Sequence, residues 1–243
     1  MPKLEVIHQD DALVVIAKPA GRIVIPGRGA AASEPCLRDE VAAAVGKRVY
    51  VVHRLDRGTS GVLVFALTPD AHRAMSVAFE RRDVDKRYLA LCRGEMLGSG
   101  EVVRALVPIR GGKMRPARPG EEGGKPSRTS WTAIQRFPGF TWVELQPHSG
   151  RLHQIRAHAA LLGFPLAVDA DYGGAALLRA SDLDPMTTDL IGEQIVIDRL
   201  TLHAATIRFH HPTTGQSMEL GAPLPLDLSM VLEILRTVRQ RAR

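Results

Sequence analysis

The 243-residue chain has 45% hydrophobic and 24% charged residues, an ordinary globular balance, and is long enough for one large domain or two small ones. Its two cysteines, Cys36 and Cys92, give neither a disulfide framework nor a paired-cysteine metal site, which predicts a reducing compartment, the cytoplasm. No apolar run is long enough to span a membrane, and the start MPKLEVIHQDD lacks the apolar core of a signal peptide.

The first part of the chain shows short strand patterns interrupted by two helical ones. Apolar runs at 4–7 and 13–17 flank Gln9-Asp10-Asp11 and predict a hairpin. Apolar residues at helical spacing predict a helix over 37–45 that ends at Gly46. A buried strand is expected over 62–67, then a helix capped by Asp70 and running to about Arg81, then a strand over 88–92.

The second part begins with residues 111–128, which are rich in Gly, Pro and charge and predict a flexible hairpin tip or insertion. Strands are expected over 130–134, 141–146, 195–196 and 204–209, and helices over 152–162 and 226–239. The chain has no internal repeat and no regular alternation of strands and helices. These patterns predict an α+β fold with a mixed, largely antiparallel sheet and flanking helices.

The net charge of +6 favours a polyanionic partner. Basic residues are clustered in two segments, where they can bind successive RNA phosphates. The alternative is that the first cluster is a solvated loop and the second a frayed helix end. These residues are Arg104, Arg110, Lys113, Arg115, Arg118, Lys125 and Arg128, and in the tail Arg236, Arg239, Arg241 and Arg243.

Three familiar motifs are approached but not completed. GEEGGKPS resembles a phosphate-binding loop, but Pro126 stands where Ser or Thr is required. Gly58-Thr59-Ser60-Gly61 is one residue short of a nucleophile elbow, which disfavours a serine hydrolase. His148, His153 and His158 recur every five residues and do not share one helical face, so no metal site is predicted.

Several further motifs occur together: KPAG at 18–21, HRLDRGTSG at 53–61, KRYLA at 86–90, GRLHQIRAH at 150–158 and RLTLHA at 199–204. With these motifs the chain resembles the RluA-type family of RNA pseudouridine synthases, from about Leu4 to Leu228. The resemblance implies the pseudouridine synthase fold with a central RNA-binding cleft. It also implies an isomerase that converts selected uridines of ribosomal or transfer RNA to pseudouridine, with no cofactor.

The resemblance assigns three catalytic residues. Asp56 in HRLD matches the family's catalytic aspartate, Arg156 the arginine that pairs with it, and Tyr88 the tyrosine that stacks on the target base. An opposite charge near a buried carboxylate keeps it ionised. The carboxylate can attack the ribose anomeric carbon, act on a sugar-derived intermediate or add to the uracil ring, and the sequence leaves these routes open.

RNA contacts are expected from a further set of residues. Because the target base must leave its stack, Arg54 is expected to fill the gap or bind a phosphate, while His53 could do so or brace the turn. The remaining candidates line the rim of the cleft or contact phosphate: Lys18, Arg22, Arg28, Lys86 and Arg151.

The expected organisation is one catalytic domain over residues 1–243, with a core over about 4–228, a basic helical tail over 229–243 and no N-terminal accessory RNA-binding domain. We expect a monomer that binds an RNA stem-loop, with neither a membrane nor a nucleotide cofactor as partner. Two alternatives stay open: a catalytically silent RNA-binding or ribosome-assembly factor of the same fold, and a nucleoside or glycoside hydrolase. The hydrolase would need a second acidic residue, and Asp169 and Asp171 could approach Asp56 only through folding.

Overall fold

The computed structural model describes residues 4–27, 33–187 and 189–241. Contacts between Cα atoms divide the chain into two compact units, Met1–Lys86 with Ala204–Pro223, and Arg87–His203 with Leu224–Arg243. Each unit combines antiparallel strand pairs with a few helices, and occasional parallel bridges make the pairing mixed. The predicted α+β class with largely antiparallel pairing is therefore confirmed. None of the helices in the described ranges is long and apolar enough to cross a membrane.

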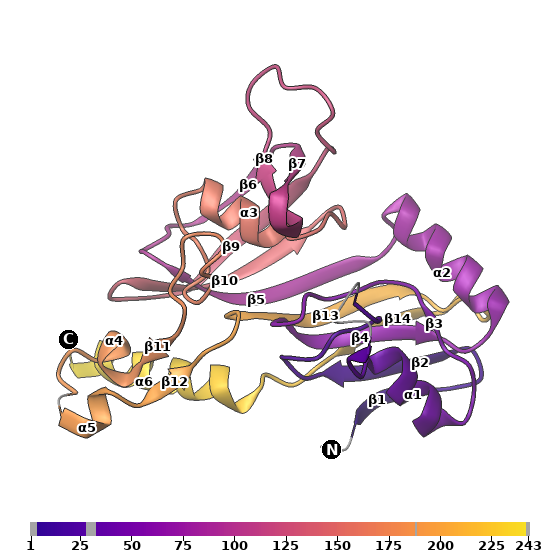
Figure 1. The fold of residues 1–243 in the computed structure, drawn as a ribbon, viewed down its shortest axis with the longest axis horizontal. Coiled ribbons are helices and arrows are strands. Elements are labelled where there is room, and N and C mark those ends of the chain that lie inside the picture. The colour runs from indigo at the N-terminus through magenta and orange to yellow at the C-terminus, as the bar shows by residue number, and fades with distance from the viewer. Residues whose placement is uncertain (1–3, 28–32, 188, 242–243) are drawn as a thin grey trace. The chain divides into compact units, whose positions relative to one another are not determined.

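The first unit is built on antiparallel strands (Figure 1). The order β1-β2-β4-β13 follows from the pairing, with β3 on β4 and β14 on β13. All residues of β4 are buried, as expected for an inner strand, so its apolar run determines its place. The bounds are Glu5–Gln9 (β1), Leu13–Lys18 (β2), Tyr50–Val51 (β3), Ser60–Ala66 (β4), Leu202–His210 (β13, whose first two residues belong to the other unit) and Ser217–Gly221 (β14).

Two helices belong to this unit, α1 (Leu37–Val45) and α2 (Pro69–Arg81). Gly46 ends α1 in the left-handed region at φ 66°, as predicted. The prediction that Asp70 caps α2 is wrong. The hydroxyl of Thr68 accepts from the Ala71 N–H at 3.1 Å, because Thr68 is extended and Pro69 takes the first helical position, where its missing N–H costs nothing.

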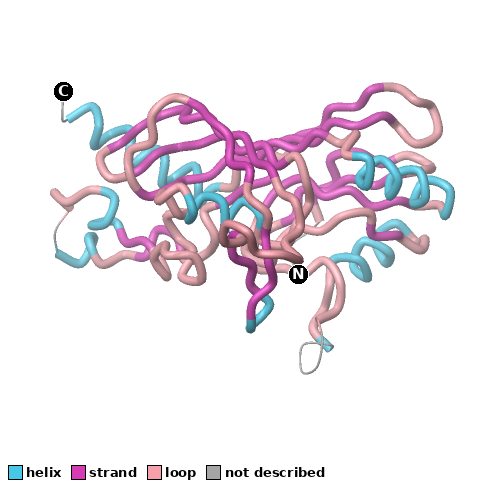
Figure 2. The backbone as a smooth tube through the Cα atoms, turned by 90° about the horizontal axis from the view of Figure 1, so that it is seen from above, coloured by secondary structure: helices cyan, strands magenta, loops and turns pink. Residues whose placement is uncertain are grey.

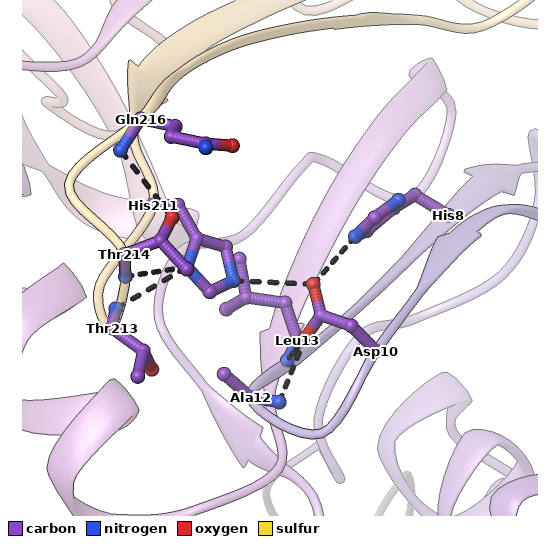
Figure 3. A network of polar contacts seen from close by, with 8 residues as sticks. All are labelled: His8, Asp10, Ala12, Leu13, His211, Thr213, Thr214 and Gln216. Carbon is purple, nitrogen blue, oxygen red and sulfur yellow. Dashed lines mark hydrogen bonds and ion pairs between the residues drawn. The ribbon is translucent and has the colours of Figure 1, made fainter.

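A polar network joins the β1–β2 turn to the β13–β14 turn (Figure 3). Asp10 Oδ2 is bound by His8 Nε2 at 2.6 Å and by His211 Nε2 at 3.1 Å, while Oδ1 accepts from the N–H groups of Ala12 and Leu13. Burial would raise the pKa of Asp10, but these hydrogen bonds and the nearby imidazole of His211 lower it below its ordinary value. One carboxylate thus fixes both turns at one end of the sheet.

The second unit contains four antiparallel strands in the order β5-β10-β9-β6. One face of the β5, β9 and β10 strands carries Leu91, Phe137 and Trp142, which pack with buried leucines of α6 (Leu226–Arg241). The other face carries Ala90, Val143 and Leu145 and packs with Ile155 of α3 (Gln154–Leu161). The strand bounds are Asp85–Arg93 (β5, whose first two residues belong to the first unit), Ser99–Val103 (β6), Arg128–Phe137 (β9) and Phe140–Pro147 (β10).

Shorter elements complete the second unit. Part of the predicted flexible insertion is a regular hairpin, in which β7 and β8 join through a turn of 3₁₀ helix, and Figure 2 shows the two strands meeting at that turn. Apolar residues at Leu106 and Met114 are buried, which explains why this segment folds. The bounds are Leu106–Ile109 (β7), Arg110–Gly112 (η2), Lys113–Pro116 (β8), Leu178–Arg179 (β11), Ala180–Leu183 (α4), Asp189–Gly192 (α5) and Ile195–Ile197 (β12).

Candidate active site

Asp56 lies in a tight turn between β3 and β4 of the first unit, where its side chain is partly buried. The N–H of Thr59 donates to the Asp56 carbonyl at 3.0 Å and closes the turn. The residue that follows Asp56, Arg57, forms two hydrogen bonds with Gly21: its carbonyl accepts from the Gly21 N–H at 2.8 Å, and its Nε donates to the Gly21 carbonyl at 3.1 Å. The KPAG segment and the HRLD segment are therefore held together.

Lys18 supports the same turn from inside. Its side chain is only 1% exposed, and its ammonium donates to the carbonyls of Thr59 at 2.7 Å, Pro19 at 3.0 Å and Arg57 at 3.1 Å. Because a buried ammonium needs acceptors for its donors, Lys18 fixes the backbone at Arg57 and Thr59, just after Asp56, and at Pro19 in its own segment. Lys18 is thus a positioning residue, and the prediction that it lines the rim of an RNA cleft is not supported, since its charged end is buried in the fold.

Gly61, at the end of the motif, has both of the features that require glycine. Its φ of 125° is disfavoured for other residues, and a Cβ here would lie 2.2 Å from the carbonyl oxygen of Ala204. The TSG part of the motif is therefore the point where β4 and β13 approach closely. This close approach explains why the motif ends in glycine.

His53 braces the turn from the other side. Its Nε2 accepts from the Val64 N–H at 3.0 Å, and its ring stacks on Phe79 of α2 with centroids 4.8 Å apart. Burial, with a smaller contribution from the positive charge of Lys86, lowers the pKa of His53 to about 3. The histidine is neutral in the fold, so the bracing interpretation is supported over the direct RNA contact.

The other basic candidates of the first unit differ in their surroundings. Arg54 is exposed, whereas Arg22 is paired with Glu40 of α1 and only partly exposed. Burial lowers the pKa of Lys86, partly opposed by the neighbouring Asp85. Arg28 lies outside the described residues. Arg54 is therefore the candidate whose position best suits a contact with RNA.

Tyr88 lies in β5 of the second unit, opposite Leu145 of β10, and packs at the edge of the cluster that contains Ala90. It is partly buried. The predicted stacking of Tyr88 on the target base stays a prediction.

Arg156 lies on α3 and is surrounded by one turn of the chain, residues 169–174. Its Nε and Nη2 donate to the two oxygens of Asp169, each at 2.7 Å, and Nη2 also donates to Asp171 at 3.1 Å. The ring of Tyr172 lies 4.7 Å from the guanidinium carbon. The side chains of Arg156 and Asp169 are 7% and 1% exposed. The predicted pair of Arg156 with Asp56 stays a prediction.

The same contacts bear on the hydrolase alternative. A glycosidase needs a carboxyl group that can hold a proton, but Asp169 accepts two charge-assisted bonds from Arg156. The hydrogen bond from Lys113, together with that from Arg156, lowers the pKa of Asp171 despite some burial. Both carboxylates are therefore already engaged by basic side chains, Asp169 by Arg156, and Asp171 by Arg156 and Lys113. Sequence reasoning gave them no such role, although the glycine pair in DADYGG marks a tight turn.

Arg151 and His153 mark the start of α3. The Nε of Arg151 is buried and has no hydrogen-bond partner among the described residues, and His153 has a positive φ of 50°. A bound acceptor would satisfy Arg151, as the predicted phosphate contact requires. Within the described ranges, no three His, Cys, Asp or Glu side chains cluster as metal ligands would.

Comparisons with known proteins identify the family of this chain. Residues 12–161 match the family model described as RNA pseudouridylate synthase. The chain is 37% identical to "Ribosomal large subunit pseudouridine synthase C" of Vibrio vulnificus over 96% of this chain and 70% of that protein. It is also 37% identical to "Ribosomal large subunit pseudouridine synthase D" of Xanthomonas campestris, over 98% of this chain and 71% of that one.

A solved structure shows the same fold at lower identity. "Human RNA Pseudouridylate Synthase Domain Containing 4" aligns with a TM-score of 0.73 and 24% identity, covering 96% of this chain and 93% of that one. The pseudouridine synthase fold expected from the motifs is thereby confirmed. With the family match over more than half of its residues, the chain belongs to the RNA pseudouridylate synthase family and is an isomerase that acts on RNA.

Proposed function

We propose that this enzyme isomerises uridine in the RNA of the large ribosomal subunit, with Asp56 as its catalytic carboxylate. The observation that carries the RNA target is the 37% identity, over nearly the whole chain, to relatives named for the large ribosomal subunit. The observation that supports Asp56 is the construction of its turn, in which a buried ammonium binds three backbone carbonyls. So much local order beside one carboxylate suits a group that must be held in place during a reaction.

The reaction exchanges one glycosidic bond for another. The bond from uracil N1 to the ribose anomeric carbon breaks, the base turns, and carbon five forms the new bond to the sugar. The hydrogen on carbon five leaves as a proton and N1 gains one, so no oxidant or reductant is consumed. The protein must supply a nucleophile or base for the sugar, a base for carbon five and a surface that holds the free uracil.

Asp56 is assigned the first of these tasks. An ionised carboxylate can add to the anomeric carbon, remove a proton from the sugar or add to the ring, and all three routes need the negative form. Arg156 is assigned to favour that form, since a guanidinium stays protonated throughout the reaction. Its pairs with Asp169 and Asp171 hold the guanidinium in one orientation.

Tyr88 is assigned to the base. Its ring offers an apolar face on which uracil can stack, and its hydroxyl can accept the proton from carbon five directly or through water. Arg54, being exposed, is assigned to occupy the gap that the extruded uridine leaves in the RNA. Arg151 is assigned to a phosphate, which would give its buried Nε an acceptor.

The test is release of tritium from uracil carbon five in RNA taken from cells that lack this gene. Ribosomal and transfer RNA are assayed separately with the parent, with Asp56→Asn and with Asp83→Asn, a matched change at an exposed aspartate. The parent and Asp83→Asn should release tritium from large-subunit RNA at the same rate, and Asp56→Asn should release none while still binding RNA.

Each arm has a result that contradicts one part of the proposal. Release from transfer RNA alone would overturn the ribosomal target but leave the chemistry. Substantial release by Asp56→Asn would remove the aspartate from its role. Tight RNA binding without release by any protein would favour the catalytically silent RNA-binding factor.

A further inference from the structure

The surroundings of Arg156 connect it to a part of the chain that none of the catalytic motifs contains. Asp169, Asp171 and Tyr172 all come from one turn of six residues, 169–174. The turn is closed by its own backbone, because the Asp169 carbonyl accepts from the N–H of Tyr172 at 3.0 Å and of Gly174 at 2.9 Å. Gly174 is required here, since a Cβ would lie 2.2 Å from the Leu166 carbonyl oxygen. The 169–174 turn, called the holder below, is therefore closed by its own backbone and binds the guanidinium of Arg156.

The holder is itself tied to the β7–β8 hairpin at two adjacent residues. The Met114 N–H donates to the hydroxyl of Tyr172 at 2.8 Å, and the ammonium of Lys113 lies 2.6 Å from Asp171 Oδ1. Met114 is buried in a small cluster with Leu106 and Ala157, against which Tyr172 packs. Figure 1 shows β8 beside α3, the helix that carries Arg156.

The Tyr172 hydroxyl also reaches the start of that helix. It lies 3.0 Å from Nδ1 of His153, whose ring meets the tyrosine edge-on at 5.6 Å. One side chain thus contacts the hairpin and the first turn of α3 through its hydroxyl, and the guanidinium through its ring face. A residue with only a packing role would need no such hydroxyl contacts.

We propose that Tyr172 is a positioning residue that sets the orientation of Arg156, and that it does so through its contact with the β7–β8 hairpin at Met114. The ion pair of Lys113 with Asp171 is a second contact between the hairpin and the 169–174 turn. This inference rests on the proposed function, in which Arg156 supports the reaction. While the hairpin contacts Tyr172 and Asp171, these two side chains keep the guanidinium of Arg156 in place. When the hairpin is displaced, Asp171 loses its ion pair with Lys113 and Tyr172 loses the hydrogen bond from Met114, so two side chains that contact the guanidinium lose a support together.

The first experiment compares Tyr172→Phe with Tyr50→Phe in the tritium-release assay. Tyr172→Phe keeps the ring over Arg156 and removes only the hydroxyl. Because small misplacements of an active-site group cost one to two orders of magnitude in rate, we expect kcat to fall about tenfold with KM for RNA unchanged. Tyr50, which stacks on His72 in the first unit, should tolerate the same change without effect on either constant. An unchanged kcat in Tyr172→Phe would overturn the proposal.

The second experiment asks whether Tyr172 acts through Arg156. If it does, Tyr172→Phe should lower kcat in the parent background but not in an Arg156→Lys background, where the planar guanidinium is already gone. An equal loss in both backgrounds would show an effect on the fold and overturn the proposal, as would an Arg156→Lys enzyme as fast as the parent. Should Tyr172→Phe fail to fold, Lys113→Met carries the same test with a smaller expected loss.

A third measurement does not depend on activity. The Nε–H of Arg156 is buried against Asp169 and should give a slowly exchanging signal in ¹⁵N-labelled protein. We expect Tyr172→Phe to speed this exchange several-fold and Tyr50→Phe to leave it alone. Unchanged exchange would overturn the coupling even in an active enzyme, whereas faster exchange in a protein without isomerase activity would keep the coupling and overturn the proposed function.

Discussion

Two buried cations organise the two units in different ways. In the first unit the ammonium of Lys18 binds three backbone carbonyls around the Asp56 turn. In the second unit the guanidinium of Arg156 binds two carboxylates and lies against an aromatic ring. The ammonium is a compact point charge that shapes a backbone from within, whereas the planar guanidinium is itself held in a set direction by its partners.

The difference indicates what each cation contributes. The ammonium of Lys18 fixes the positions of backbone carbonyls in the Asp56 turn. Removing the ammonium should therefore change the shape of the turn and hence the fold. The side chains of the turn over 169–174 are arranged around Arg156, so its loss leaves a buried carboxylate without its partner but leaves the backbone closure of that turn in place. Stability should therefore respond to both, and backbone order chiefly to Lys18.

The largest effect is expected for Lys18→Met, which keeps the apolar stem and removes the ammonium. The Thr59 carbonyl, in a buried hydrogen bond, and the Pro19 and Arg57 carbonyls, in partly buried ones, then lose a donor. At about 1 to 3 kcal/mol for each group left unsatisfied, the free energy of unfolding should fall by about 5 kcal/mol. Urea unfolding measures this loss. Lys47→Met, at a lysine whose side chain is 58% exposed, is the matched control and should lie within about 0.5 kcal/mol of the parent. A fall no larger than the control's would contradict the role of the carbonyls.

Arg156→Met should have the next largest effect. It leaves the carboxylate of Asp169 buried and without its bidentate partner, and removing one member of a buried pair costs about 3 to 5 kcal/mol. The loss should be partly restored in Arg156→Met with Asp169→Asn, since the uncompensated charge is then gone. Arg136→Met, at an exposed arginine 4.0 Å from Glu95, serves as the control. A double variant less stable than the single one would count against the ion pair as the cause.

Gly61→Ala tests the close approach of β4 to β13. The new Cβ would meet the Ala204 carbonyl oxygen at 2.2 Å, so we expect a loss of about 2 to 3 kcal/mol from overpacking and backbone strain. Gly139→Ala is the matched control, because Gly139 also has a positive φ, 73°, but meets nothing within 4 Å. If both variants lost the same free energy of unfolding, the loss would come entirely from the positive φ and not from the contact of the new Cβ with the Ala204 carbonyl oxygen.

The smallest effect concerns the pH dependence of stability. The pKa of His53 is about 3 in the fold and near 6.5 when unfolded. Below pH 6.5 the unfolded chain therefore binds a proton that the folded chain does not, and stability falls with decreasing pH, by at most about 1.4 kcal/mol per pH unit. In His53→Gln, whose side chain can still accept a hydrogen bond from the Val64 N–H, the urea midpoint of unfolding should change less between pH 6 and pH 4 than in the parent. His72→Gln is the control. If the urea midpoint of His53→Gln changed with pH as steeply as that of His72→Gln, His53 would not titrate as described.

Much of the secondary structure was predictable because it is encoded locally. The short apolar runs of β1 and β2, the helical spacing and terminal glycine of α1 and the apolar stretch of β4 all lie close to where they were expected. The cap of α2 was misplaced by two residues, since Thr68 and Asp70 are both good caps and only the extended backbone of Thr68 decides between them. The β7–β8 hairpin was underestimated because the burial of Leu106 and Met114 depends on residues far away in sequence.

The family and the identity of the candidate catalytic groups could be inferred from the sequence alone, because HRLD, KRYLA and HQIR are contiguous motifs whose chemistry follows from residue type. The surroundings of the supporting residues, in contrast, became known only from the folded chain. Lys18 changed from an expected RNA contact to a buried support, and the acidic residues of DADYGG became the holders of Arg156. Burial and hydrogen-bond partners are set by residues distant along the chain, so residue type alone does not reveal whether a lysine faces solvent or three carbonyls.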